Sequence, residues 1–197
     1  RQVNRKTSTR DKVNALFIGS AHGPNVMAAE FIVEKLAPKL PDIHFDIAGS
    51  CLSPTTKAPD NVTIHGRISN AAKNELLEHS SIALNPMSTG SGSNLKVLEY
   101  MAWGLPIVST PFGVRGFPPG VEKHVIIREA EDFSETLEKA IASAEAQKAR
   151  KARIDFFDKN LAMETLSAMA RDVITGLSKP RKRALFVTYR YTDPPLG

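Results

Sequence analysis

Short apolar runs alternate with stretches of helical periodicity through most of the chain, and this alternation restricts the fold more than any other feature. Each run has only three to six residues, which suits a buried strand and is too short for a buried helix. Strands that are apolar along their whole length are typical of a parallel sheet covered by helices on both faces. The predicted strands lie at residues 13–18, 43–48, 62–65, 82–84, 107–109 and 125–127.

Helical spacing fills most of the intervals between these runs. We expect Asn25 to cap the first helix and prolines 38 and 41 to end it before Leu40, because proline removes a helical hydrogen bond. Further helices are predicted at 69–79, at 94–102 and, with a break at 154–158, through 128–177. The sequence therefore predicts one doubly wound α/β domain over residues 13–178, with a mainly parallel, Rossmann-like sheet of about six strands.

The charge of the chain is concentrated at its two ends. The net charge is +5, but residues 1–12 and residues 179–197 each hold five basic residues and one acidic residue, which leaves the body between them negative. A nucleic-acid-binding domain usually carries its positive charge on the folded body, so we expect no nucleic-acid partner. We predict residues 1–12 to be a disordered lead-in or linker. Contact of the basic ends with an anionic membrane surface is an open alternative.

Residues 179–197 differ from the body of the chain. A basic linker at 179–183 leads to an apolar run at 184–189 and then to a loop rich in proline and glycine. We interpret this as the start of a further α/β domain, and the chain as an excised segment of a longer protein. No apolar run approaches the ~20 residues of a membrane helix, and the one cysteine, Cys51, excludes an internal disulfide. We expect a cytoplasmic protein, with peripheral membrane contact as the alternative.

The segment from Ser88 to Thr110 has the strongest chemical signal. Its first two glycines, Gly90 and Gly92, allow a ligand to approach the backbone closely, and the helix that follows directs unpaired N–H groups and its positive dipole end toward the same loop. Lys96 adds a cation in the first helical turn, and Glu99 lies three residues further on nearly the same face. This pattern predicts a phosphate-binding loop. The alternative is a flexible loop with a Lys96–Glu99 surface pair.

In a doubly wound sheet, ligands bind at the carboxyl ends of the strands. The candidate site is therefore made of the loops at 19–25, 49–53, 66–69, 86–94 and 110–117. Two readings of His22 in the first loop stay open: a ligand contact and a histidine bonded to backbone. We expect His65, Tyr100 and Trp103 to pack in the domain. Since no residues have metal-ligand spacing, we predict no metal and no cofactor.

Four segments in this order carry a family resemblance: FIGSAHGPN at 17–25, FDIAG at 45–49, NVTIHGRI at 61–68, and the glycine segment at 90–110. From residue 14 to about 177 the chain resembles the C-terminal, donor-binding domain of GT-B glycosyltransferases, in particular the retaining enzymes of family 4. The resemblance implies that Glu99 holds the ribose hydroxyls of a nucleotide. The first glutamate of the family's pair would fall at Ser91, and the basic pair after the first strand is replaced by Ser20 and His22.

This leaves Lys96 and backbone N–H groups as the main diphosphate partners, and residues 66–68 match the stretch that lies along the nucleobase. The donor-binding residues implied by the resemblance are Gly19, Ser20, His22, Gly66, Arg67, Gly90, Ser91, Gly92, Ser93, Asn94, Lys96 and Glu99.

The resemblance implies a hexosyltransferase-like, retaining glycosyltransferase of polysaccharide biosynthesis. Its donor would be a nucleotide-diphosphate sugar and its acceptor a saccharide, lipid-linked or cell-surface glycan. In the family the acceptor domain precedes this one, so we expect the fragment alone to be inactive. Two alternatives stay open: a catalytically degenerate nucleotide-sugar-binding module, favoured by the missing acid at Ser91, and a nucleotide-sugar epimerase of the same fold. A dinucleotide dehydrogenase is disfavoured, because no G-x-G-x-x-G follows the first strand.

Overall fold

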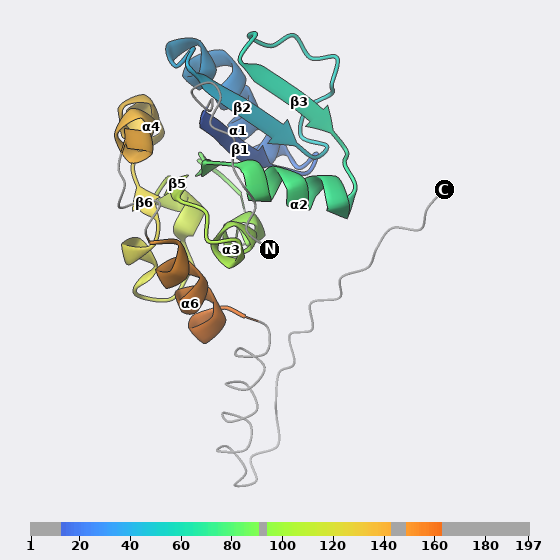
Figure 1. The fold of residues 1–197 in the computed structure, drawn as a ribbon. Coiled ribbons are helices and arrows are strands. Elements are labelled where there is room, and N and C mark those ends of the chain that lie inside the picture. Colours follow the sequence, from blue (N-terminus) through green and yellow to red (C-terminus); the bar gives the residue numbers. More distant parts are fainter. Residues whose placement is uncertain (1–12, 91–93, 143–148, 163–197) are drawn as a thin grey trace, which may run out of the picture. The chain divides into compact units, whose positions relative to one another are not determined.

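A computed structural model describes residues 13–90, 94–142 and 149–162, and the structural statements below concern these residues. Six strands form one sheet in the order β3-β2-β1-β4-β5-β6, and every neighbouring pair is parallel (Figure 1). This confirms the predicted mainly parallel sheet. The strands are β1 (Val13–Ile18), β2 (Ile43–Ala48), β3 (Val62–Gly66), β4 (Ile82–Asn85), β5 (Ile107–Ser109) and β6 (Ile126–Ile127).

Five α-helices accompany the sheet in the described residues. They are α1 (Gly23–Phe31), α2 (Asn70–His79), α3 (Leu95–Ala102), α4 (Phe133–Ala142) and α6 (Arg150–Asn160). The first helix continues through a π-helical turn (Ile32–Leu36) and a 3-10 turn (Ala37–Lys39), so it ends before Leu40 as predicted. Gly104 follows α3 with φ +68°, a left-handed conformation that glycine adopts at low cost. None of the described helices is long and apolar enough to cross a membrane.

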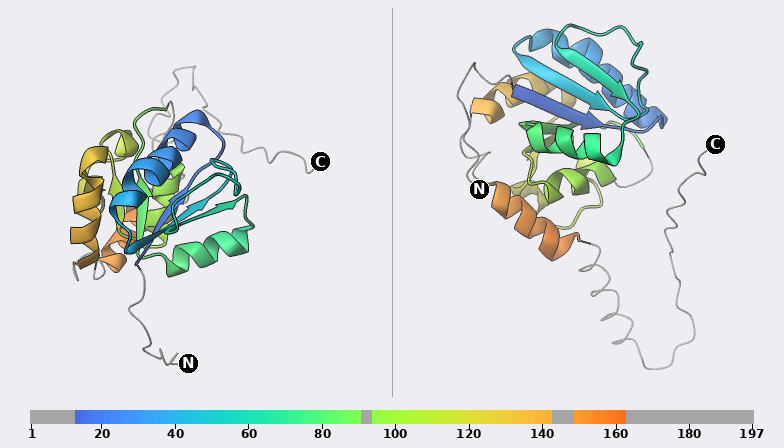
Figure 2. Two further views of the ribbon diagram at one scale, coloured as in Figure 1. Left: turned by 90° about the horizontal axis from the view of Figure 1, so that it is seen from above. Right: turned by 45° about the vertical axis from the view of Figure 1, so that its right-hand side comes forward.

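The helices cover both faces of the sheet (Figure 2). Neighbouring residues of a strand point to opposite faces, and on β1 Phe17 and Leu16 enter different apolar clusters. The cluster around Phe17 includes Ile32 after α1 and Phe133 of α4. The cluster around Leu16 includes residues of α2, α3 and α6: Leu77, Val97, Tyr100, Met101, Phe156 and Phe157. The fold is therefore doubly wound.

Two predictions about helices were wrong. Asn25 does not cap α1: the cap position is His22, and the Asn25 side chain instead bonds Ser20 and Lys96. The predicted break at 154–158 is absent, since α6 runs unbroken through it. Tertiary contacts hold this polar helix in place, because its Arg153 is buried and donates from Nε to the carbonyl of Gly104 at 2.9 Å.

The other terminal predictions lie outside the described residues. These are the lead-in at 1–12, the helical stretch at 163–177, and the linker and further domain at 179–197. The domain boundaries accordingly stay predictions.

Candidate functional site

The strand order places the candidate site between β1 and β4. β1 pairs with β2 on one side and with β4 on the other, so the order of the sheet reverses there. In an open parallel sheet, the loops on either side of such a reversal diverge and leave room for a ligand at the carboxyl ends of the strands. Since all strands are parallel, the predicted loops after them meet at this one edge.

Three glycines connect the loops after β1, β2 and β3. The N–H of Gly19 donates to the carbonyl of Ala48 at 2.9 Å, and the N–H of Gly49 donates to the carbonyl of Gly66 at 2.7 Å. Gly49 has φ +98°, and a Cβ atom there would lie 2.1 Å from the carbonyl oxygen of Gly19. The predicted site glycines Gly19 and Gly66 are therefore held in register by Gly49, which the sequence analysis placed in a candidate loop and in the segment FDIAG but did not name as a site residue.

Helix α3 carries Lys96 and is fixed to β1 by a buried tyrosine. Val97, Tyr100 and Met101 face the core, and the Tyr100 hydroxyl accepts the backbone N–H of Ile18 at 2.9 Å. This confirms the prediction that Tyr100 packs in the domain. Burial raises the pKa of the Tyr100 phenol, which keeps it neutral. The packing of α3 directs the neighbouring Lys96 toward the carboxyl end of β1.

The Lys96 side chain meets one residue each from helix α1, strand β1 and the loop after β4. Its Nζ donates to Asn25 Oδ1 at 2.7 Å, lies 3.6 Å from Met87 Sδ, and lies 5.0 Å from the centre of the Phe17 ring. The ring face attracts the cation, but all three groups are neutral. Burial lowers the pKa of Lys96 to about 8, with a smaller opposing effect from Cys51. Lys96 is therefore a partly desolvated cation at the switch point of the sheet.

Glu99 faces a different partner from Lys96. Its Oε1 lies 2.5 Å from Nζ of Lys73 on α2, and both side chains are about 30% exposed (Lys73 27%, Glu99 30%). Among the described residues, the ion pair of Glu99 is thus with α2 and not with Lys96. The predicted alternative of a Lys96–Glu99 surface pair does not describe this arrangement.

Buried amides hold the segment around the glycine loop. Asn94 precedes α3, and its Nδ2 donates to the carbonyl of Gly113 at 2.9 Å. Asn85, the last residue of β4, donates to the same carbonyl at 3.1 Å and to Ser109 Oγ at 3.0 Å. The guanidinium of Arg115 donates to the carbonyl of Gly90. The start of α3 is therefore anchored to the loop after β5. Ser91, Gly92 and Ser93 lie outside the described residues.

The remaining predicted residues lie on the rim of this edge. Ser20 and His22 are exposed in the loop after β1, and Arg67 is exposed after β3. Ser20 Oγ accepts from Asn25 Nδ2 at 3.1 Å, and neighbouring Ala21 donates its N–H to Ser50 Oγ at 3.0 Å. In the described part of the chain, no three histidine, cysteine or acidic side chains gather as a metal site would require.

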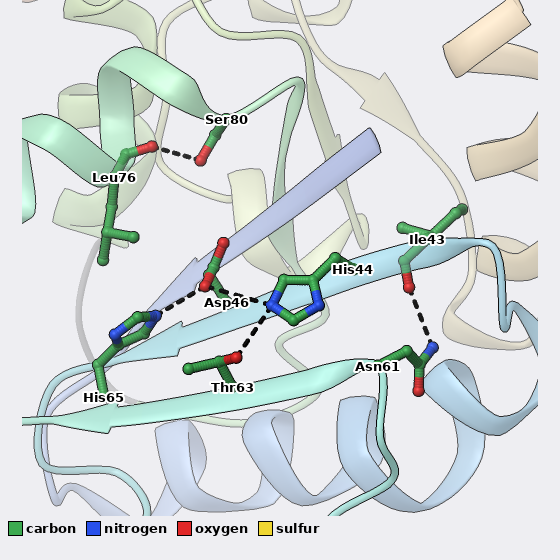
Figure 3. A network of polar contacts seen from close by, with 8 residues as sticks. All are labelled: Ile43, His44, Asp46, Asn61, Thr63, His65, Leu76 and Ser80. Atoms are coloured by element: carbon green, nitrogen blue, oxygen red, sulfur yellow. Dashed lines mark hydrogen bonds and ion pairs between the residues drawn. The ribbon is translucent and has the colours of Figure 1, made fainter. Parts of the chain in front are cut away.

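A second polar cluster lies on β2 and β3 (Figure 3). Asp46 is buried, and its Oδ1 lies 2.7 Å from His65 Nε2 and 3.7 Å from His44 Nε2. His44 Nε2 also lies 3.0 Å from Thr63 Oγ1. His65 therefore packs on the sheet, as predicted, and its polar ring atom is matched by a buried carboxylate. This cluster is separate from the contacts of Lys96.

The sequence matches the glycosyl transferases group 1 family over residues 12–144. The chain belongs to this family. No curated protein matches it. Among solved structures, this glycosyltransferase domain is similar to WaaG, a glycosyltransferase involved in lipopolysaccharide biosynthesis, with 20% identity and a TM-score of 0.60, over 85% of this chain and 48% of that one.

Two further structures have the same fold. Alr3699/HepE of Anabaena, in complex with UDP, is 12% identical with a TM-score of 0.62, over 85% of this chain and 49% of that one. A glycosyltransferase of Rickettsia africae ESF-5 is 13% identical with a TM-score of 0.65, over 88% and 50%. The glycosyltransferase domain thus spans about half the length of each structure, and its architecture is that of one half of a GT-B enzyme.

Sequence reasoning missed three residues that shape this site. Asn25 was taken as a helix cap, Met87 as an ordinary loop residue, and Arg115 was not singled out. Arg115 had a signal, as the sole basic residue in the candidate loop at 110–117. Asn25 and Met87 lay in candidate loops, but the sequence could not show their contacts with Lys96, because those depend on a side chain distant in sequence. Two hollows of about 480 and 570 Å³ lie along β6, and their described linings contain no predicted site residue.

Proposed function

We propose that this glycosyltransferase domain binds the nucleotide-diphosphate part of a sugar donor at the carboxyl ends of β1 and β4. The observation that carries the proposal is the environment of Lys96. Its half-buried ammonium contacts an amide, a thioether and an aromatic ring, which supply no negative charge. A buried cation is unfavourable unless an anion offsets it, and a diphosphate would provide that charge.

The start of α3 supports the same ligand. The first turn of a helix has backbone N–H groups without helical partners, and its dipole favours an anion. Lys96 lies in that turn, and the anchoring of Asn94 to Gly113 holds the turn in place. Of the donor-binding residues implied by the family, the main diphosphate ligands would be Lys96 and the backbone of the segment from Gly90 to Asn94.

We assign the ribose to Glu99 and the nucleobase to the backbone at Gly66 and Arg67. A carboxylate can accept two hydroxyl hydrogen bonds and retain a lysine partner, so the ion pair with Lys73 does not prevent this role. The UDP bound to the Anabaena protein of the same fold is consistent with a nucleoside diphosphate ligand. We propose no metal and no cofactor for this domain.

In the proposed reaction, the bond between the anomeric carbon and the diphosphate oxygen breaks, and an acceptor hydroxyl oxygen forms the new bond and loses its proton. Lys96 and the helix terminus would stabilise the charge on the leaving diphosphate. The acceptor would be a saccharide, lipid-linked or cell-surface glycan, with retention at the anomeric carbon. A second domain would bind it, so this fragment should bind donor without transferring sugar. The setting we propose is cytoplasmic polysaccharide biosynthesis.

A panel of UDP, GDP, ADP and dTDP tests the donor site. Ligands that bind only the folded state raise the melting temperature, and calorimetry then gives the dissociation constants. We expect at least one nucleoside diphosphate to bind, and Lys96→Ala to weaken it by ~2 kcal/mol, the range for a hydrogen bond with a charged group. Lys57→Ala, which removes an exposed lysine, is the matched control. Equal affinity of the Lys96 and Lys57 variants would overturn the assignment.

A catalytically degenerate nucleotide-sugar-binding module is the second candidate. The observation that favours it is Ser91, which stands where the family has the carboxylate for the donor sugar. Both candidates predict nucleotide binding, so turnover separates them. Release of nucleoside diphosphate from a nucleotide-sugar, measured after adding an acceptor domain from a protein of the same family, supports the enzyme. Binding without turnover supports the module.

A further inference from the structure

Asn25 connects the loop after β1 to the lysine of α3. Its Oδ1 accepts from Lys96 Nζ at 2.7 Å, and its Nδ2 donates to Ser20 Oγ at 3.1 Å. The residue is the third of α1, where its backbone N–H bonds the carbonyl of His22 at 2.8 Å. Both ends of the amide are therefore engaged, and its position is fixed by the start of the helix.

An amide suits this position electrostatically. Lys96 lies in a partly desolvated place, and the Asn25 oxygen stabilises the ammonium without removing its positive charge. A carboxylate would neutralise the charge, and a basic residue would repel it. The loop at 19–25 itself holds no lysine, arginine or acidic residue. The positive charge beside this loop is therefore supplied by Lys96 of α3.

We propose that Asn25 is a positioning residue, which holds the Lys96 ammonium at the carboxyl end of β1 and leaves its charge available for a diphosphate. The inference rests on the proposed function, because it concerns the same anion site. Asn25 belongs neither to the glycine loop nor to the family's acidic pair, so it is an additional residue of that site.

The other neighbours of Lys96 hold its ammonium less firmly than the hydrogen bond to Asn25. The side chain also lies against Phe17 and Met87, which restrict it but provide only weak interactions. Cys51 is the titratable group that influences Lys96, and burial raises the pKa of its thiol, so the thiol stays neutral near pH 8. Among the described residues, Asn25 therefore supplies the shortest hydrogen bond to the Lys96 ammonium.

Two substitutions of Asn25 in the 197-residue chain test the proposal. Asn25→Leu removes the hydrogen bonds at similar volume, and Asn25→Asp adds a carboxylate in nearly the same shape. Asn74→Ala, at an exposed asparagine of α2, is the control. Binding of inorganic pyrophosphate and UDP is measured by calorimetry at pH 7. The titration of the Lys96 side chain is followed without ligand by NMR of ¹³C-labelled lysine, assigned with Lys96→Arg, and melting curves establish that each variant folds.

Asn25→Leu and Asn25→Asp should shift the pKa of Lys96 in opposite directions but weaken ligand binding alike. Asn25→Leu should lower the pKa of Lys96 below its wild-type value, and Asn25→Asp should raise it. Both should weaken binding of pyrophosphate and UDP roughly tenfold, the first by losing position and the second by neutralising the cation. A purely structural role would not produce opposite shifts in the titration together with the same loss of affinity.

The outcomes separate this inference from the proposed function. Wild-type binding of either probe, with unchanged affinity in both Asn25 variants, would overturn the positioning role and leave the donor site standing. Unchanged titration of Lys96 in folded Asn25→Leu and Asn25→Asp would also overturn it. Failure of the wild type to bind UDP, pyrophosphate and the other nucleoside diphosphates would instead refute the proposed function, and the inference with it.

Discussion

Lys73 Nζ lies 2.5 Å from Glu99 Oε1, so the carboxylate proposed for the ribose is already paired with a lysine of α2. Each side chain keeps more than a quarter of its surface exposed (27% and 30%), which screens the interaction. The pair therefore orients Glu99 without burying it. A ligand can approach the same carboxylate, because an ionised carboxyl group has about four acceptor positions.

This pairing gives a prediction that separates ribose from diphosphate. Glu99→Ala should weaken UDP binding by ~1–3 kcal/mol, the cost of losing hydrogen bonds to a charged group, and leave pyrophosphate binding unchanged. Lys73→Met should change the free energy of unfolding by less than ~1 kcal/mol, as expected for an exposed ion pair. Calorimetry with both ligands checks the first statement and urea denaturation the second. If Glu99→Ala lost equal affinity for UDP and for pyrophosphate, Glu99 would be assigned to the phosphates and not to the ribose.

Binding of the diphosphate should depend on the protonation of Lys96. Its pKa is lowered by burial to about 8, so the ammonium is present below that pH and lost above it. Affinity for pyrophosphate should therefore fall as the pH rises from 7 to 9. Lys96→Arg, which stays charged throughout, should flatten this dependence. Calorimetry across this range measures it, and an equally steep decline in Lys96→Arg would show that another group is responsible.

The contribution of Lys96 to the stability of the ligand-free domain should rise with pH, whereas its contribution to pyrophosphate binding falls. The folded-state pKa of about 8 is below the ordinary value of 10.5, so between these two values the unfolded chain binds more protons at this residue. Its contribution to the free energy of unfolding therefore rises with pH across this window. Urea denaturation of the wild type and of Lys96→Met isolates this contribution. The free energy of unfolding of the Met variant, relative to that of the wild type, should decrease from pH 8 to pH 10.

Gly49 should tolerate no side chain. Its φ of +98° disfavours any other residue, and a Cβ atom would lie 2.1 Å from the carbonyl oxygen of Gly19. Gly49→Ala should lower the free energy of unfolding by at least ~2 kcal/mol through strain and overpacking. Gly23→Ala is the matched control, since nothing lies within 4 Å of a Cβ there. Denaturation curves of the two variants that coincide would contradict the close contact of the loops after β1 and β2.

The histidine and aspartate on β2 and β3 should affect folding only. His65→Ala leaves the buried Asp46 without its 2.7 Å partner and should cost about 1–3 kcal/mol of stability. The cluster lies apart from the contacts of Lys96, so the dissociation constant for UDP should not change. Denaturation and calorimetry on the same preparation check both statements. A large loss of affinity in a folded His65 variant would place the His65–Asp46 pair within the binding site.

The sequence alone predicted the layered architecture and placed the candidate site at one edge of the sheet. Strand positions follow from short apolar runs, and β1, β2 and β5 have the predicted bounds. Local sequence patterns predict these features because the face that a side chain occupies depends on the periodicity of its own strand or helix. The same logic placed Lys96 in the first turn of α3 and Tyr100 in the core.

Only the tertiary structure decided which side chains meet. Asn25 and Lys96 are 71 residues apart, and their contact depends on β1 and β4 lying side by side with α3 packed on β1. Glu99 meets Lys73 because α2 passes near α3, and α6 stays helical through 154–158 because Arg153 is buried against Gly104. Spacing along the chain determines which face a residue occupies, but long-range packing determines its partner across that face.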